Sequence, residues 1–354
     1  MENYDIVVIG AGIAGSSIAY FLEKNSNLKI LIVDKVGISQ KASNAAGAFL
    51  FPKVGFNTKY TKFVNDALLY SFDFYEKLGI KTNKNGVLIL PRDEKDIQKF
   101  QEYKKTFTLN YIEKEGGFFF KDGGVVNSIE VCKRLLQNVE FRKLEITNIK
   151  KEEHFILNNS LITKKLILAT GWESIIDIPY IKIRPVWGER IEIKTKLSLN
   201  HHYHKNCSVS TNLDGIVKIG ATHERRWSDK EPNEIEAKIL INKAKEITKI
   251  PEYSINSMKA GMRAGSLDYF PIIGNIIDTK KTLEKYPEIK KGRIPKEIFY
   301  IENLFIINGG GGRGFSNYIY SAKFLSNLIL NNSPIPEFLD TKRLFIKWAR
   351  KLDN

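Results

Sequence analysis

The chain has 354 residues, of which 43% are hydrophobic and 27% charged, and its formal net charge is +15. This size and composition predict a folded protein with a large core and more than one domain, and exclude a disordered chain or a small disulfide-stapled one. No run of about 18 or more apolar residues occurs, so we expect no membrane span. The apolar start lacks the basic flank of a signal peptide, and the two cysteines, Cys132 and Cys207, favour a reducing compartment and a cytoplasmic protein.

In chain order, the first elements form a dinucleotide-binding unit. An apolar run at residues 5–9 leads into the motif GAGIAG, a helical pattern follows, and a second apolar run ends just before Asp34. Gly10 permits a tight turn, Gly12 lets a pyrophosphate approach the backbone, and Gly15 lets the helix lie close to the strand. Asp34 can accept hydrogen bonds from a ribose hydroxyl. The predicted cofactor contacts here are Gly10, Gly12, Ile13, Ala14, Gly15, Asp34 and Lys35.

Two segments after the second strand extend the predicted cofactor site. In KASNAAG, Ser43 and Asn44 can donate to phosphate or ribitol oxygens, and ordinary turn chemistry is the alternative. The dinucleotide could be NAD or FAD. LILATG, residues 166–171, is an apolar strand that ends in a small-residue turn, which can close over the adenine side of the same ligand and favours FAD. The predicted contacts are Ser43, Asn44, Ala46, Gly47, Ala169, Thr170 and Gly171.

The middle of the chain alternates in strand fashion, which predicts an antiparallel sheet inserted into the nucleotide-binding fold. We expect a discontinuous FAD-binding domain at 1–85, 125–178 and 259–354, and a substrate domain at 86–124 and 179–258. Residues 234–249 have a helical pattern, and residues 279–297 are polar and basic, typical of a surface excursion.

The segment IINGGGGRGFSNYIY, residues 306–320, places four consecutive glycines and an arginine before a helical pattern. Backbone without Cβ atoms can approach a flavin ring closely, and the following helix N-terminus carries partial positive charge. A simple NAD dehydrogenase needs no second glycine-rich helix start, so this segment favours FAD; tight packing alone is the alternative. The predicted contacts are Gly309, Gly310, Gly311, Gly312, Arg313, Gly314 and Phe315.

Five segments, in order, resemble the FAD-dependent amine oxidoreductases related to D-amino acid oxidase and glycine oxidase. They are residues 41–55, 184–193, 215–227, 259–278 and 309–329. Within that superfamily they look most like the branch that forms the oxidoreductase half of bifunctional tRNA-modifying enzymes. The nucleotide-binding pattern begins at residue 4, without the methyltransferase half, so a separate SAM-dependent methyltransferase is the expected partner. Trp187 stands where the family commonly has arginine.

The resemblance implies a Rossmann-like FAD-binding domain with an inserted, mainly antiparallel β substrate domain. It also implies oxidation of the carboxymethylaminomethyl group of the tRNA wobble uridine, by hydride transfer to flavin N5 and imine hydrolysis, which releases glyoxylate and leaves 5-aminomethyl-uridine. Arg263 occupies the position where related oxidases hold the substrate carboxylate, and Arg313 is the second catalytic candidate. A small-molecule amine oxidase of the glycine or sarcosine oxidase type is one alternative, and a flavin-bound RNA-binding protein without turnover is another.

The remaining candidates concern metal, proton transfer and RNA. His201, His202 and His204 lack an evident fourth ligand, so no metal site is predicted, and His223 is a candidate acid–base group. The net charge favours a polyanionic partner such as tRNA, although a solvated lysine-rich surface would give the same count. The candidate RNA contacts are Lys280, Lys281, Lys285, Lys290, Lys291 and Arg293, and Lys342, Arg343, Lys347, Arg350 and Lys351 on a predicted C-terminal helix with Trp348. Trp187 and Trp227 are the candidate stacking partners for a base.

Overall fold

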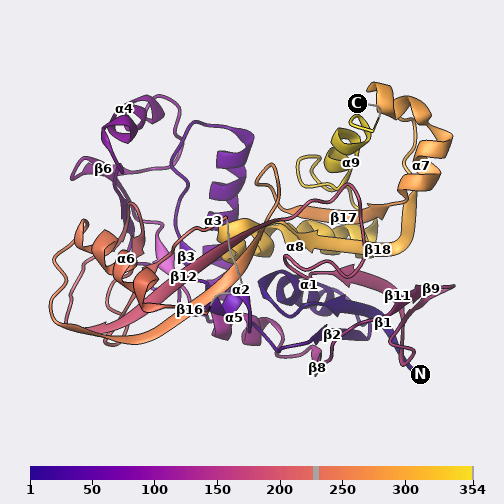
Figure 1. Cartoon of the computed structure of the whole chain (residues 1–354), viewed down its shortest axis with the longest axis horizontal. Helices are drawn as coiled ribbons and strands as arrows, with labels where there is room; N and C mark the ends of the chain where they lie inside the picture. Colours follow the sequence, from indigo (N-terminus) through magenta and orange to yellow (C-terminus); the bar gives the residue numbers. More distant parts are fainter. Residues whose placement is uncertain (226–230, 353–354) are drawn as a thin grey trace.

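The computed structural model describes residues 1–225 and 231–352, which form two large sheets and their covering helices (Figure 1). The first sheet contains β1 (Glu2–Ile9), β2 (Ile30–Asp34), β8 (Glu140–Lys143), β9 (Ile149–Lys151), β10 (Phe155–Leu157), β11 (Leu161–Leu168), β17 (Ile272–Ile277) and β18 (Tyr300–Asn308). The second contains β4 (Val87–Ile89), β5 (Ile112–Lys114), β6 (Gly117–Phe120), β12 (Arg184–Thr195), β13 (His202–His204), β14 (Ser208–Val209), β15 (Ile216–Gly220) and β16 (Tyr253–Gly265). A short ribbon pairs β3 (Phe49–Leu50) with β7 (Gly124–Val125).

The helices lie between and around these sheets. They are α1 (Ile13–Lys24), α2 (Ala42–Ala45), α3 (Lys59–Lys77), α4 (Glu94–Tyr103), α5 (Ser128–Leu135), α6 (Glu234–Lys245), α7 (Thr279–Lys285), α8 (Gly314–Asn331) and α9 (Lys342–Ala349), with 3₁₀ turns η1 (Pro287–Lys291) and η2 (Gly311–Arg313). None of the described helices is both long enough and apolar enough to cross a membrane.

Parallel pairing in the first sheet brings the carboxyl ends of its central strands to one edge. β1 pairs in parallel with β2 and with β11, and β11 pairs in parallel with β18. Helix α1 connects β1 to β2, which confirms the strand–helix–strand unit predicted for residues 5–34. Ile6 and Val8 pack into a core shared with α1 and α8, while Val7 and Ile9 pack into the core on the opposite side. Both faces of the sheet are therefore buried, as a parallel sheet requires.

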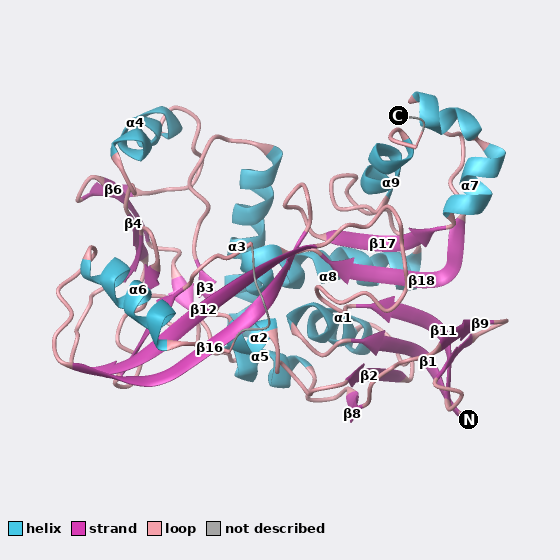
Figure 2. Cartoon of the chain, viewed as in Figure 1, coloured by secondary structure: helices cyan, strands magenta, loops and turns pink. Residues whose placement is uncertain are grey.

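The second sheet is mainly antiparallel, and its longest strands, β12 and β16, reach back toward the first sheet (Figure 2). Helix α6 packs on it through Leu240 and Ile241, which contact the core around Ile191 and Ile193. The predicted fold class, a Rossmann-like sheet with a mainly antiparallel second sheet, is therefore confirmed. The domain boundaries remain a prediction, and the one between 258 and 259 falls inside β16.

Candidate active site

Both glycine turns line a single cavity of about 530 Å³. The turn at Gly12 follows β1, and the turn at Gly311 follows β18. Because these strands end at the same edge of the sheet, segments about 300 residues apart in the sequence meet at one place. This position, outside the carboxyl ends of parallel strands, is where doubly wound sheets bind their ligands.

All but two of the predicted site residues line this cavity. Those that do are Gly10, Gly12, Ile13, Ala14, Asp34, Lys35, Ser43, Ala46, Gly47, Ala169, Thr170, Gly171, Arg263, Gly309, Gly310, Gly311, Gly312, Arg313, Gly314 and Phe315. Gly15 and Asn44 lie behind it. A Cβ on Gly15 would come within 1.8 Å of the Gly10 carbonyl oxygen, so Gly15 serves the close packing of helix on strand. Asn44 accepts a hydrogen bond from Lys259 Nζ at 3.1 Å instead of facing the cavity.

The first glycine turn is shaped for a dinucleotide phosphate. Gly10 has φ +108°, a conformation that disfavours any residue with a side chain, and its missing Cβ would collide with the Ala169 carbonyl. The amide of Ile13, at the start of α1, donates to Ser43 Oγ at 2.9 Å. Ser43 thus accepts from the helix N-terminus, while its own hydroxyl proton remains available to a ligand.

Asp34 holds the neighbouring loop as well as facing the cavity. Its Oδ2 accepts from the amide of Ala11 at 2.9 Å, and its Oδ1 accepts from those of Val36 at 2.8 Å and Gly37 at 3.1 Å. A carboxylate offers about four acceptor positions, so room remains for a ribose hydroxyl. Nearby, Lys35 and Lys41 both pair with Glu173, so the charges at this end of the cavity are balanced.

The second glycine turn is held by side chains on both sides. The amide of Gly309 donates to Asn308 Oδ1 at 2.8 Å, and Asn308 Nδ2 donates to the Gly171 carbonyl at 2.7 Å. The amide of Gly310 donates to Tyr318 Oη at 2.7 Å, so Tyr318 faces the turn as well as the core. The apolar face predicted for the following helix, Tyr318, Ala322, Leu325 and Ile329, is buried in α8. The turn thereby presents bare backbone to the cavity at a fixed position.

Arg263 enters the cavity from the end of β16. Its Nη1 donates to the carbonyls of Trp187 at 3.3 Å and Thr222 at 3.1 Å. Its side chain also passes beside the second glycine turn, because a Cβ added to Gly312 would lie 3.6 Å from Arg263 Cδ. Burial lowers the pKa of Arg263 to about 10, so the guanidinium remains charged at neutral pH. Within the part of the chain that the structure describes, no acidic side chain pairs with it.

Arg313 lies at the same end of the cavity. Its Nη1 donates to the Phe51 carbonyl at 2.6 Å, and burial lowers its pKa. Lys53 lies nearby, and its own pKa is lowered first by burial and then by the charge of Arg313. The acids that line the cavity, among the described residues, are Asp34, Glu145 and Glu173, which cluster with Lys35 at the other end. The end of the cavity that holds Arg263 and Arg313 is therefore cationic, without a balancing carboxylate among the described residues.

Two histidines line the cationic end. His204 Nδ1 lies 3.0 Å from Ser208 Oγ, and burial together with Arg313 lowers the pKa of His204 to about 4. Burial and the charge of Arg263 also lower the pKa of His223. Both imidazoles are therefore neutral at pH 7. His204 was considered in the sequence only as a metal ligand, whereas the structure places it in the cavity lining.

The other two histidines of the cluster do not line the cavity. His202 is fully buried, with Nε2 2.8 Å from the Asn83 carbonyl and Nδ1 accepting from the Thr211 amide at 2.9 Å. His201 lies against the ring of Tyr203 at 4.7 Å. Over residues 1–225 and 231–352, no three His, Cys, Asp or Glu side chains gather closely enough to hold a metal ion.

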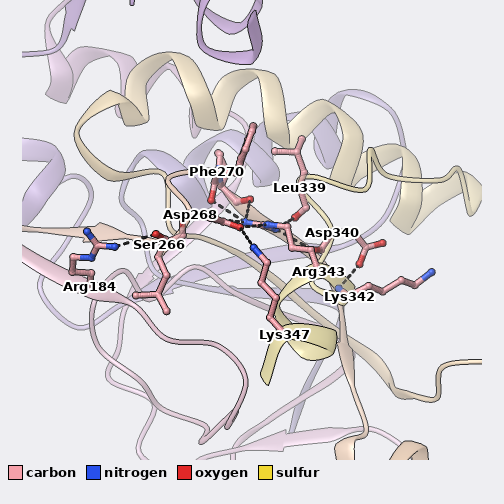
Figure 3. Close-up of polar contacts among 11 residues, drawn as sticks. Arg184, Ser266, Asp268, Phe270, Leu339, Asp340, Lys342, Arg343 and Lys347 are labelled. Atoms are coloured by element: carbon pink, nitrogen blue, oxygen red, sulfur yellow. Dashed lines mark hydrogen bonds and ion pairs between the residues drawn. The ribbon is translucent and has the colours of Figure 1, made fainter. Parts of the chain in front are cut away.

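The basic segments proposed as an RNA surface lie side by side, but one of their arginines is structural. Arg350 of the α9 end donates to the Gly292 carbonyl at 3.2 Å, and Ile289 of η1 is fully buried, so residues 279–297 are docked rather than a loose excursion. Arg343 turns inward and donates to both carboxylate oxygens of Asp268, at 2.9 and 3.1 Å (Figure 3). Arg343 is therefore not a phosphate contact, whereas the Lys347 side chain is 67% exposed.

Neither Trp187 nor Trp348 lines the cavity. The Trp187 indole N–H donates to Glu189 Oε1 at 3.1 Å, and its backbone pairs with Glu224, which directs the ring away from the cavity lining. Trp348 packs against Tyr180 and Phe345. Trp227 lies outside the described residues.

The lining suits a bound FAD. The turn at Gly10 and Gly12 leaves no Cβ where a pyrophosphate would approach, and Asp34 stands beside it for a ribose. The second turn continues the same cavity with Gly311, whose missing Cβ would meet nothing within 4 Å. The small residues Ala46 and Gly47 line the same cavity, which leaves further room for a ligand that contacts both turns.

Comparison with known proteins agrees with this lining. The family model described as "FAD dependent oxidoreductase" matches residues 5–328. The chain is similar to the tRNA 5-methylaminomethyl-2-thiouridine biosynthesis bifunctional protein MnmC of Legionella pneumophila strain Lens, with 24% identity over 93% of this chain and 54% of that protein. It is similar to the protein of the same name from Campylobacter jejuni subsp. doylei, with 25% identity over 95% of this chain and 56% of that protein. The chain thus spans about half the length of these curated relatives.

Solved structures of two small-molecule enzymes share the fold. Glycine oxidase from Geobacillus kaustophilus superposes with a TM-score of 0.77 at 15% identity, covering 95% of this chain and 96% of that one. L-Proline dehydrogenase from P. horikoshii superposes with a TM-score of 0.76 at 17% identity, covering 97% of this chain and 98% of that one. At these identities the likeness concerns the fold alone.

Proposed function

Because the chain belongs to the family of FAD-dependent oxidoreductases, we propose that it oxidises the carboxymethylaminomethyl group on the wobble uridine of tRNA. The carbon between amine and carboxylate loses a hydride, the resulting imine takes up water, and glyoxylate leaves, so that 5-aminomethyl-uridine remains. FAD, when bound, supplies the two-electron acceptor.

The observation that carries the proposal is the cationic end of the cavity. Arg263 and Arg313 line it without an acidic partner among the described residues, next to the glycine turn at Gly311. A buried guanidinium without a counter-ion calls for an anionic ligand, and its planar donors suit a carboxylate. The substrate side chain is an N-alkylated glycine, whose carboxylate meets this need.

The same charges favour the reactive form of the amine. A hydride leaves the carbon readily only when the adjacent nitrogen has its lone pair, so the amine must be neutral. Nearby cations lower the pKa of an ammonium group. With His204 and His223 neutral, Arg263 and Arg313 dominate the local field, and together they hold the carboxylate while disfavouring the protonated amine.

Support for tRNA as the substrate comes from outside the cavity. The curated relatives are named for tRNA modification, and the formal net charge of +15 suits a polyanion. The primary amine that forms is a suitable acceptor for a methyl group from S-adenosylmethionine, transferred by a separate catalytic unit.

A small-molecule amine oxidase is the second candidate, because Arg263 would hold the carboxylate of free glycine or sarcosine equally well. The two candidates differ in what is attached to the nitrogen. Purified protein, loaded with FAD, would be mixed without oxygen with tRNA that carries the carboxymethylaminomethyl group, and separately with sarcosine. We expect loss of the flavin absorbance and release of glyoxylate with the tRNA; loss with sarcosine alone would exclude the proposal in favour of the second candidate.

The cellular test is nucleoside analysis of tRNA from a strain that lacks the protein. We expect the carboxymethylaminomethyl nucleoside to accumulate and to disappear when the gene is restored. An Arg263→Ala copy should fail to restore it, which separates an enzyme from an RNA-binding protein without turnover.

A further inference from the structure

Tyr269 is an exposed aromatic residue at the mouth of the cavity. It lines the cavity, yet 57% of its surface is accessible to solvent. It lies in the loop of residues 266–271, directly after β16, the strand that carries Arg263. Single exposed rings are common on protein surfaces, but this one lies at the entrance to the ligand cavity, where a bound ligand can contact its open face.

The backbone of Tyr269 is held in a conformation that its side chain disfavours. Its φ is +70°, in the left-handed region that residues other than glycine, asparagine and aspartate rarely enter. Such outliers persist only where the surroundings enforce them, and they gather at binding and catalytic sites. Tyr269 thus combines a strained backbone with an exposed ring at the cavity entrance.

Arg343 of α9 contacts the residues on both sides of Tyr269, and Figure 3 shows it beside Asp268 and Phe270. It donates to both carboxylate oxygens of Asp268, immediately before Tyr269, and to the carbonyls of Phe270 and Pro271, immediately after it, each at 3.0 Å. Ser266 Oγ adds a hydrogen bond to Asp268 at 3.2 Å. The residues on either side of Tyr269 are therefore fixed to the C-terminal helix, and the ring between them is held out over the mouth.

The surroundings of the ring are aromatic and cationic. The Tyr60 ring, which also lines the cavity, lies 5.9 Å from that of Tyr269. The Arg184 guanidinium lies 5.5 Å from the Tyr269 ring and donates to the Leu267 carbonyl at 3.0 Å, and Lys53 lies 5.5 Å from the Tyr60 ring. The one carboxylate of the loop, Asp268, is neutralised by Arg343. Tyr60 is half-buried, so Tyr269 is the exposed ring of the pair. An exposed aromatic ring beside cations is a means by which proteins hold unpaired bases and the phosphates next to them.

We propose that Tyr269 is the stacking surface for the uracil ring of the substrate, with Arg184 and Lys53 placed for the flanking phosphates. This rests on the proposed function, because it takes the substrate to be an unpaired base of RNA. The base would lie on Tyr269 at the mouth, and its substituted methyl group would extend inward to Arg263. It assigns to Tyr269 the role that the sequence had suggested for Trp187, whose indole N–H is bonded to Glu189.

The test measures binding of an RNA anticodon stem-loop whose wobble uridine carries the carboxymethylaminomethyl group, by fluorescence anisotropy with the FAD-loaded protein. Tyr269→Ala should weaken binding about tenfold, the size of one base–aromatic stack, while Tyr269→Phe keeps the ring and should bind nearly as the unaltered protein does. Tyr253→Ala is the matched control, since Tyr253 is also exposed, at 38%, but begins β16 away from the cavity.

A second stem-loop with no base at the wobble position isolates the contact. It should bind the unaltered protein and Tyr269→Ala equally, because the stacking partner is missing from both. The inference is overturned if Tyr269→Ala binds the complete stem-loop as tightly as the unaltered protein does. It is also overturned if Tyr269→Phe loses as much binding affinity as Tyr269→Ala. If the unaltered protein binds neither stem-loop, the proposed function itself fails, which is a different outcome from the failure of Tyr269 alone.

Discussion

The guanidinium of Arg263 lies against the bare backbone of Gly188. A Cβ added to Gly188 would come within 2.1 Å of both Nη1 and Nη2 of Arg263. The two residues are diagonal neighbours across the β12–β16 pairing, in which Gly188 is opposite Gly261 and Val186 is opposite Arg263. The missing side chain at Gly188 is therefore what leaves room for the arginine to reach the cavity.

Gly188→Ala should inactivate the enzyme and spare its fold. The added methyl group displaces the end of a flexible arginine side chain, which can move without disturbing the strand. A carboxylate anchor displaced by about 1 Å costs on the order of 100-fold in kcat/KM, and the free energy of unfolding should change by less than about 1 kcal/mol. Steady-state kinetics measures kcat/KM, and urea denaturation measures the free energy of unfolding.

The matched control is Gly55→Ala. A Cβ on Gly55 would meet only Thr61 Oγ1, at 3.7 Å, and Gly55 does not line the cavity. We expect this variant to keep its activity. If Gly188→Ala were as active as Gly55→Ala, the position of the Arg263 guanidinium would not matter for the reaction.

Arg263→Ala should lower kcat/KM about 100- to 1000-fold while the protein still binds FAD. The estimate assumes two hydrogen bonds between charged partners, each contributing about 1.5–3 kcal/mol, with incomplete additivity. Arg263→Lys should recover only a small part, because an ammonium cannot make the two parallel bonds. Arg142→Ala, which removes an ion pair with Glu2 at the edge of the first sheet, serves as the control. If Arg263→Ala left KM and kcat unchanged, Arg263 would be excluded as the residue that binds the substrate carboxylate.

Arg343→Met should destabilise the protein by about 3 kcal/mol. The change leaves the partly buried carboxylate of Asp268 with only Ser266 Oγ at 3.2 Å and Lys347 at 3.9 Å, and it also removes the donors to the carbonyls of Leu339 and Asp340. Lys347→Ala, on the same helix, removes an exposed cation 3.9 Å from Asp268 and should cost less than about 0.5 kcal/mol. Equal urea midpoints for the two variants would contradict this role of Arg343.

The parts of the site that depend on local backbone were predictable from the sequence. Gly10 and Gly15 occupy fixed places in a strand–turn–helix unit, because the turn demands positive φ and the helix demands close approach. The run from Gly309 to Gly312 could be assigned to the same cavity because both turns follow apolar strands of the kind that pair in parallel.

What depends on pairing between distant segments was not predictable. Gly188 matters only because β12 lies beside β16, and the sequence carries no sign of that register. Arg343 has the helical spacing of a solvent-facing residue, yet a loop 75 residues earlier supplies its carboxylate. Tyr269 gave no signal at all, since its exposure and its φ follow from how that loop is tied to α9.

The last prediction concerns acid stability, and it depends on His202. The buried ring is neutral, with Nδ1 accepting from the Thr211 amide, and burial lowers the pKa of His202 to about 4 from its ordinary 6.5. The unfolded chain therefore binds a proton below pH 6.5 that the folded protein does not bind until about pH 4, so stability falls as the pH falls through this window.

Between about pH 7.5 and about pH 5.5, His202 alone should remove about 1.3 kcal/mol from the free energy of unfolding. His202→Gln should be less stable near neutral pH, because two buried hydrogen bonds are altered, but its stability should fall less steeply across that interval. Tyr203→Phe, on the opposite face of β13, should leave the steepness unchanged. Urea denaturation at several pH values gives the slopes, and a His202→Gln slope equal to that of the unaltered protein would mean that His202 takes up its proton in the folded state as readily as in the unfolded one.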